Sequence, residues 1–348
     1  MVPETFSVMT EVLWSPNFWL GQTKLSWKDF EDVNTNTCEL LYPIPIALLI
    51  LFSRGIFTNF VFEKLGPFLG IKRSARTNLV VNSKLEDAFV DRNNSEKGSI
   101  IKKAIEAGMT ERQAERWLRK RIQNDAPTRS EKLVETAWRA IYYLSMWSYG
   151  IIILYKKKWF WNTRYCWYDY PRHQVEDEIR SFYMIQLTFY WFLTLSQVYG
   201  DSTKKRKDFW QMLLHHVATI ALICFSWVLN MLRAGMLVLV LHDTADVFLE
   251  IAKMCKYAKW QKTCDAMFVL FTLSWIITRL YIYPKYVVYT TVFESAEIVG
   301  LAPVYYVMNG FMILLQILHV IWTYYLLKAV VKVIKSNGNV QDERSSSE

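Results

Sequence analysis

The 348-residue chain has few cysteines, histidines, glycines and prolines, with 5, 5, 12 and 9 residues of each type. The five cysteines follow no spacing typical of a zinc site or a redox motif, which argues against both. Residues 1–43 lack a basic start followed by an apolar core, so they do not predict a cleavable signal peptide. Targeting would then depend on the first membrane span.

Apolar and aromatic residues are abundant, at 52% hydrophobic residues with 15 Trp, 20 Tyr and 20 Phe. The length alone would allow two or three soluble domains. However, apolar runs of about 20 residues recur, the length an α-helix needs to cross a bilayer. We therefore expect an all-α integral membrane protein with about seven transmembrane helices, a six-helix bundle preceded by one N-terminal span. The expected spans are 44–62, 134–155, 182–200, 209–229, 234–252, 266–288 and 303–327.

The distribution of Lys and Arg predicts the orientation of these spans. Most of the 41 basic residues lie in 63–133, 200–208, 253–265 and 328–348. Positively charged loops stay in the cytosol, which puts the N-terminus in the lumen and the C-terminus in the cytosol. Only the luminal run Lys156 to Lys158 opposes this topology. The net charge of +9 then suits anionic headgroups and anionic cytosolic ligands, and nucleic acid is not needed to explain it.

The predicted topology divides the chain into five parts. They are a luminal segment 1–43, a first span 44–62, a helical cytosolic insert 66–130, a membrane domain 131–335 and a polar cytosolic tail 336–348. In the luminal segment, the tryptophans of "LWSPNFWLG" are expected to anchor it at the membrane interface. Cys38 and Cys166 both fall on the luminal side, where free thiols are the favoured interpretation over a disulfide.

The insert resembles the last two helices of a homeodomain. Thr110 and Gln113 form a capping box ahead of "QAERWLRKRI". Trp117 and Leu118 match the start of a recognition helix, and basic residues follow them. Lys120 stands where the homeodomain family has its adenine-reading Asn, so DNA reading is not expected. We expect a structural or lipid-facing cytosolic module.

Ionisable residues concentrate in residues 213–246, inside two apolar spans. His215 and His216 would lie roughly 10 Å below the cytosolic face, with Asp246 roughly 9 Å and His242 roughly 15 Å deep on the next, antiparallel span. The two sets therefore occupy the same level of the membrane.

Helical spacing places these groups relative to one another. His242 and Asp246 are four residues apart and Asp243 and Asp246 three, and Glu250 continues the row, so one stripe should face the bundle interior. A histidine paired with a carboxylate in a dry cavity suits acyl transfer. Imidazole can act as base or nucleophile, and the carboxylate stabilises the imidazolium. The alternatives are interhelical hydrogen bonds that only set packing, and a zinc or iron site.

Further polar residues lie near this cluster. Arg279, in the sixth span, is expected to pair with an acid or bind substrate. Asn230 and Arg233 lie at a luminal turn, where capping and snorkelling would also explain them. The basic run at the cytosolic end of the fourth span suits a nucleotide phosphate as well as a membrane anchor. It comprises Lys204, Lys205, Arg206 and Lys207.

Residues 205–257 closely resemble the Lag1 motif of ceramide synthases, and 131–335 resembles the TLC membrane domain. The shared pattern is His215-His216, Thr219, Ser226, Asn230, Arg233, Gly235, His242-Asp243, Asp246, Leu249-Glu250 and Lys253. The resemblance also covers "WSPNFWLG", the first span and the insert, although "RKRIQNDAP" is less basic than is usual there.

The resemblance implies N-acylation of a sphingoid base by fatty acyl-CoA in the endoplasmic reticulum membrane. Acyl-CoA would be a co-substrate, with no metal and no other cofactor. His215 and His216 match the family's catalytic pair, and His242, Asp243 and Asp246 match its second cluster. Residues 289–300 match a loop that influences acyl length. Substrate contacts are expected from Lys204 to Lys207, Ser226, Asn230, Arg233, Glu250 and Arg279, and membrane lipids and a homo- or hetero-dimer are further expected partners. A non-enzymatic lipid-binding or translocation-associated protein is the alternative.

Overall fold

The computed structural model describes residues 15–21, 27–30, 33, 35–57, 63–64, 68, 105, 108–125, 128–200 and 208–335. Within these residues all regular structure is helical, which confirms the all-α prediction for this part of the chain. The tail 336–348, the run Lys204 to Lys207 and most of the insert lie outside the described residues.

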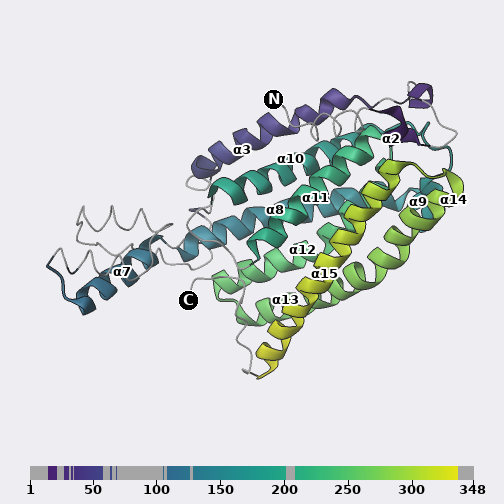
Figure 1. Ribbon diagram of the computed structural model, residues 1–348. Coiled ribbons are helices and arrows are strands. Elements are labelled where there is room, and N and C mark those ends of the chain that lie inside the picture. The colour runs from purple at the N-terminus through teal and green to yellow at the C-terminus, as the bar shows by residue number, and fades with distance from the viewer. Residues whose placement is uncertain are drawn as a thin grey trace, which may run out of the picture.

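Long helices packed side by side form an elongated bundle (Figure 1). They are α3 (Pro43–Phe57), α8 (Arg129–Tyr155), α10 (Asp177–Gly200), α11 (Phe209–Val228), α12 (Leu232–Ala258), α13 (Gln261–Trp275) and α15 (Pro303–Lys335). α13 continues without a break into η6 (Ile276–Val288), a π-helix that contains Pro284. Each predicted span overlaps one of these helices.

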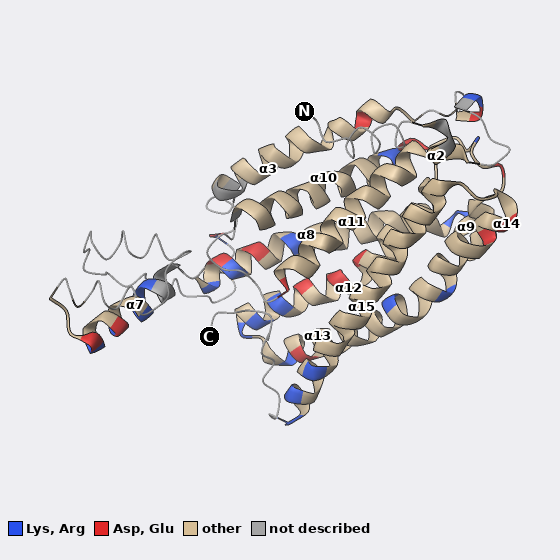
Figure 2. Cartoon of the chain, in the orientation of Figure 1, with Lys and Arg blue, Asp and Glu red and all other residues tan. Residues whose placement is uncertain are grey.

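Three of the described helical segments are long and apolar enough to cross a membrane, namely Phe209–Val228, Gln261–Ile298 and Pro303–Lys335. The charged residues of the bundle lie mostly near its two ends (Figure 2). The protein is therefore a multi-pass membrane protein, and the count of seven spans stays a prediction.

α12 lies at the centre of the bundle, packed along α8 on one side and α13 on the other. Its start closely approaches α10. A Cβ at Gly235 would lie 2.0 Å from the hydroxyl of Tyr183, so only glycine lets the two helices pack at this distance. A core of buried aromatic and aliphatic side chains, including Phe182 and Trp227, surrounds this contact and fixes the position of α12.

Short elements cap one end of the bundle (Figure 1). They are α2 (Pro16–Leu20), η1 (Trp27–Phe30), η2 (Thr37–Leu41), α9 (Lys158–Trp161), η5 (Thr163–Cys166), η7 (Thr290–Glu294) and α14 (Ser295–Ile298). Polar contacts join them: Thr163 donates to Glu294 at 3.0 Å and Arg164 to Glu297 at 3.0 Å. The segment that contains residues 289–300 is thus tied to η5.

The described part of the insert is α7 (Glu111–Asp125). The predicted capping box is confirmed, since the backbone N–H of Thr110 donates to the Gln113 side chain at 2.9 Å and that of Gln113 to Thr110 Oγ1 at 3.4 Å. Trp117 and Leu118 are buried, as expected for the apolar face of an amphipathic helix.

Cys38 is exposed, Cys166 is buried, and both are free, which confirms the preference for free thiols. Burial raises the pKa of the Cys166 thiol to about 12, so it holds almost no thiolate at neutral pH. We expect a membrane-impermeant maleimide to label Cys38 in the folded protein and to label Cys166 only after denaturation. Mass mapping of the labelled peptides checks this, with Cys38→Ser as the control, and rapid labelling of folded Cys166 would contradict it.

Candidate functional site

The two predicted polar sets meet inside the bundle. His215 and His216 come from α11, and His242 from α12. The rings of His215 and His242 lie parallel with centroids 6.5 Å apart, and those of His215 and His216 are 5.8 Å apart. All three histidines are buried. The depth estimate from sequence therefore placed these residues at the same level.

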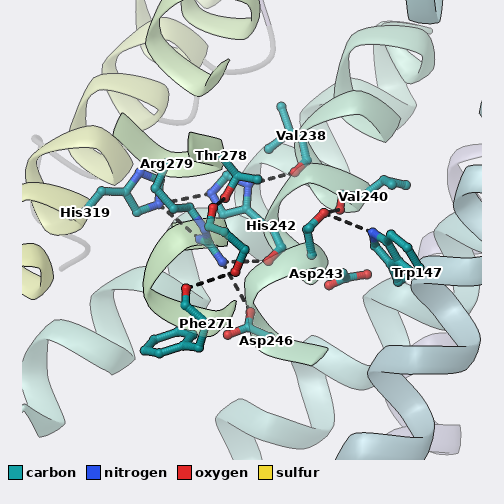
Figure 3. A network of polar contacts seen from close by, with 12 residues as sticks. Trp147, Val238, Val240, His242, Asp243, Asp246, Phe271, Thr278, Arg279 and His319 are labelled. Atoms are coloured by element: carbon teal, nitrogen blue, oxygen red, sulfur yellow. Dashed lines mark hydrogen bonds and ion pairs between the residues drawn. The ribbon is translucent and has the colours of Figure 1, made fainter. Parts of the chain in front are cut away.

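A fourth histidine completes the cluster. His319 of α15 is fully buried, and its Nε2 lies 3.2 Å from Nε2 of His242 (Figure 3). Sequence reasoning missed it, although an ionisable residue inside an apolar span is itself a functional signal. The imidazoles thus come from three helices that are distant in sequence.

Arg279 connects this cluster to α12 (Figure 3). It lies on η6, and π-helical turns are frequent at functional sites. Its guanidinium donates to the carbonyl of His242 at 2.6 Å, to Asp246 Oδ2 at 3.3 Å and to His319 Nε2 at 3.2 Å. The ring of Trp275 lies 4.9 Å from the guanidinium carbon. Of the two expected roles for Arg279, the structure contains the ion pair with an acid.

The two aspartates do not pair with the imidazoles of His215, His242 or His319, so the expected histidine–carboxylate couple is wrong for these residues. Asp243 Oδ2 accepts a hydrogen bond from Gln186 Nε2, and Asp246 pairs with Arg279. His242, Asp243 and Glu250 are nevertheless buried in the bundle, as the predicted inward stripe requires.

The imidazole of His242 forms a hydrogen bond with the backbone of its own helix and not with a carboxylate. Its Nδ1 lies 2.7 Å from the carbonyl of Val238, one turn back, and donates to it. The Nε2 therefore carries a lone pair. Nε2 of His319 has one in-plane lone pair, which accepts from Arg279 at 3.2 Å, and the same atom lies 3.2 Å from Nε2 of His242. Arg279 therefore holds the His319 ring against the His242 ring.

His319→Phe tests whether this contact between His319, Arg279 and His242 matters for turnover. The substitution keeps a ring of similar shape and removes both nitrogens, so we expect kcat to fall about tenfold, the effect of one lost buried hydrogen bond, with KM for the acyl donor little changed. His319→Asn, which keeps an acceptor and a donor, should recover part of the rate. Steady-state kinetics on the two purified variants checks this, and an unchanged kcat for His319→Phe would contradict it.

A cavity of about 750 Å³ begins at this cluster and extends to the α14 end of the bundle. His242 and Tyr190 lie at its inner end, and Trp167, Ser295 and Tyr305 line its other end. Its walls are almost entirely apolar, as in most pockets that bind small molecules. The ring of Tyr190 lies 6.5 Å from that of His215 and 6.3 Å from that of His216, so it stands between the cavity and both histidines.

The remaining predicted residues take different positions. Ser226 lines the cavity and contacts the Tyr183 hydroxyl at 3.2 Å. Asn230 donates to the carbonyl of His173 at 2.8 Å, and Arg233 to that of Tyr165 at 2.8 Å, so both hold the loop that precedes α10. Glu250 is buried and pairs with Lys253 at 2.6 Å. Asn230 and Arg233 therefore make structural contacts at the end of the bundle far from His319.

Within the described residues, no group of three or more His, Cys, Asp or Glu is placed to hold a metal ion. The imidazoles contact each other, Arg279 and aromatic rings.

Comparisons with known proteins show the family to which this chain is related. Residues 132–328 match the TLC domain family (TRAM, LAG1 and CLN8). Mouse ceramide synthase 5 is 36% identical over 351 residues, covering 99% of this chain and 84% of the relative. Bovine ceramide synthase 4 is 34% identical, with 99% and 88% covered, and mouse ceramide synthase 3 is 36% identical, with 99% and 89% covered.

The fold and the site thus define a TLC-domain membrane protein. With its similarity to these relatives over nearly its whole length, the chain belongs to the ceramide synthase family, whose members are acyltransferases.

Proposed function

We propose that this protein transfers a fatty acyl group from acyl-CoA to the amine of a sphingoid base such as sphinganine, giving dihydroceramide and free CoA. The observation that carries this proposal is a buried imidazole cluster at the inner end of a long apolar cavity.

The cavity supports the placement of the acyl chain. Its apolar walls would contact the fatty tail. Each CH₂ group buried in this way would stabilise binding by about 0.8 kcal/mol. Because the cavity ends at Tyr190 and His242, a tail lying in it would bring its carboxyl end up to the histidines. The thioester carbonyl would then lie at His242 and Tyr190, with His215 and His216 on the other side of the Tyr190 ring and the CoA moiety toward the α13 end of the bundle.

The histidines would supply the proton transfers of the reaction. The amine nitrogen bonds to the thioester carbon, the carbon–sulfur bond breaks, and the proton lost from nitrogen ends on the sulfur of CoA. Nδ1 of His215 has no hydrogen-bond partner among the described residues, and the ring is held between His242 and Trp322. A ring fixed in this way suits a base or a nucleophile.

Asp243 would receive the sphingoid amine. The carboxyl is completely buried, and its Oδ1 has no hydrogen-bond partner among the described residues. A buried carboxylate without a cation is costly, so a cationic ligand would stabilise it. Gln186 holds the other oxygen and itself accepts a hydrogen bond from the Tyr142 hydroxyl at 3.0 Å. Asp243 thus has a fixed orientation and one unsatisfied acceptor.

The membrane setting follows from the same proposal. We place the protein in the endoplasmic reticulum membrane, with the N-terminus in the lumen and the C-terminus in the cytosol. In this orientation the α14 end of the cavity would face the lumen. Lys204 to Lys207, which precede α11 in sequence, would then be on the cytosolic side and could bind the phosphates of CoA. Acyl-CoA serves as the acyl donor, and no further cofactor is included.

Purified full-length protein in lipid nanodiscs, given isotopically labelled acyl-CoA and sphinganine, should form labelled dihydroceramide and free thiol in equal amounts. Mass spectrometry and a thiol assay measure the two products. Folded protein that binds acyl-CoA without turnover would contradict the proposal and favour a lipid-binding protein. Intact-mass analysis after acyl-CoA alone separates the two routes: an acyl adduct indicates an acyl-imidazole, and its absence a direct transfer.

A further inference from the structure

A second cavity, of about 390 Å³, lies beyond the far end of the first one. It is called the outer chamber below. Four residues line both cavities: Trp167, Met231, Ser295 and Tyr305. These side chains therefore form a partition between the first cavity, called the acyl cavity below, and the outer chamber.

The partition has fixed and adaptable parts. The indole N–H of Trp167 donates to Thr290 at 2.8 Å, and the hydroxyl of Tyr305 donates to the carbonyl of Val292. Both rings are thereby held in place. Met231, in contrast, is an unbranched side chain, and methionine readily takes another rotamer. A chain that pushes against the partition would displace Met231 first.

The amino-terminal segment closes the outer chamber. Trp19 and Leu20 of α2 and Phe30 of η1 line it. The ring of Trp19 packs against Phe225 of α11 with centroids 5.7 Å apart. Trp19, which the sequence predicts to lie at the membrane interface, thus also packs against the end of the bundle.

Gly21 holds this segment against α15. It has a φ of +53°, and a Cβ there would lie 2.8 Å from the Cα of Ala302. Only glycine combines that backbone conformation with so close an approach. The motif "WSPNFWLG" therefore places Trp19 and Leu20 across the open end of the chamber.

We propose that the outer chamber receives the terminal carbons of the longest fatty acyl chains, and that Trp19 and Leu20 set the upper limit of chain length. This inference rests on the proposed acyl transfer. The occupant is the acyl tail because the chamber continues the cavity that starts at His242, and its inner walls include the apolar side chains of Leu229 and Val304. The limit would thus depend on the amino-terminal segment as well as on Ser295, Val299 and Gly300, which line the same chamber.

Two substitutions should move the limit in opposite directions. Leu20→Ala enlarges the chamber, and Val304→Phe fills it. With saturated acyl-CoAs of stepwise increasing length, we expect the rate ratio between the longest accepted chain and one four carbons shorter to rise about tenfold in Leu20→Ala and to fall about tenfold in Val304→Phe. Val304→Ile, which adds one methylene, should lower the ratio less than Val304→Phe.

Leu41→Ala is the control. Leu41 lies in the same amino-terminal segment, is 63% exposed and does not line the chamber, so its truncation should leave the chain-length profile unchanged. Identical profiles for wild type, Leu20→Ala and Val304→Phe would overturn the inference while leaving the acyl transfer intact. Wild-type protein that forms no ceramide with any chain length would instead overturn the proposed function.

Discussion

Replacing His215 or His216 with alanine is expected to lower ceramide formation by about 10²-fold to 10⁴-fold, the usual contribution of a general base. The two rings lie at the inner end of the apolar cavity, on the far side of Tyr190. Adjacent residues of a helix point about 100° apart, so one ring cannot take the place of the other. Initial rates with labelled acyl-CoA, measured on equal amounts of folded protein, check this expectation.

Val217→Ala provides the control for this pair. Val217 follows His216 on α11 and is half exposed on the outside of the bundle. Its truncation should leave both the rate and the thermal stability close to wild type. If His215→Ala and His216→Ala both kept the wild-type rate while folded, the histidines would contribute only to helix packing and the proposed chemistry would be wrong.

The meeting of His215 and His242 was predictable because it depends on local geometry. Helical rise and the antiparallel order of two neighbouring spans fix the level of each residue. The capping box at Thr110 is equally local, since both partners lie within one turn. Features that need only a few neighbouring residues can therefore be inferred from the sequence of this chain.

The partners of these groups were not predictable in the same way. Which side of α12 faces α10 and which faces η6 depends on the rotation of the packed helices. That rotation directs Asp243 to Gln186 and Asp246 to Arg279. His319 lies 77 residues from His242. A sequence pattern can mark it as a buried ionisable residue, but only the packing of α15 against α12 brings the two rings together.

The contacts of the amino-terminal segment could not be predicted from the sequence either. Tryptophans beside a membrane span indicate an interfacial position, and nothing near Trp19 in sequence indicates Phe225 as its neighbour. The close approach of Gly21 to Ala302 joins residues at opposite ends of the chain. Contacts of this kind form the wall of the outer chamber, and they depend on the folded structure and not on neighbouring residues in the sequence.

Arg279→Met is expected to destabilise the protein by about 3 kcal/mol or more, the usual cost of removing one partner of a buried ion pair. Arg279 is 3% exposed, and its single guanidinium serves Asp246, His319 and the carbonyl of His242. Methionine fills much of the same volume and leaves these groups without their donor. The thermal unfolding midpoint in detergent should fall by several degrees, and acyl transfer should fall because His319 loses its fixed position.

Two further variants separate charge from geometry. Arg279→Lys keeps the positive charge, but an ammonium group cannot reproduce the planar fork that reaches three acceptors, so its stability should lie between those of wild type and Arg279→Met. Asp246→Leu combined with Arg279→Met removes the uncompensated carboxylate and should be more stable than Arg279→Met alone. If the double variant were no more stable than the single one, the loss would come from His319 and the His242 carbonyl, and the ion pair with Asp246 would contribute little to holding η6 against α12.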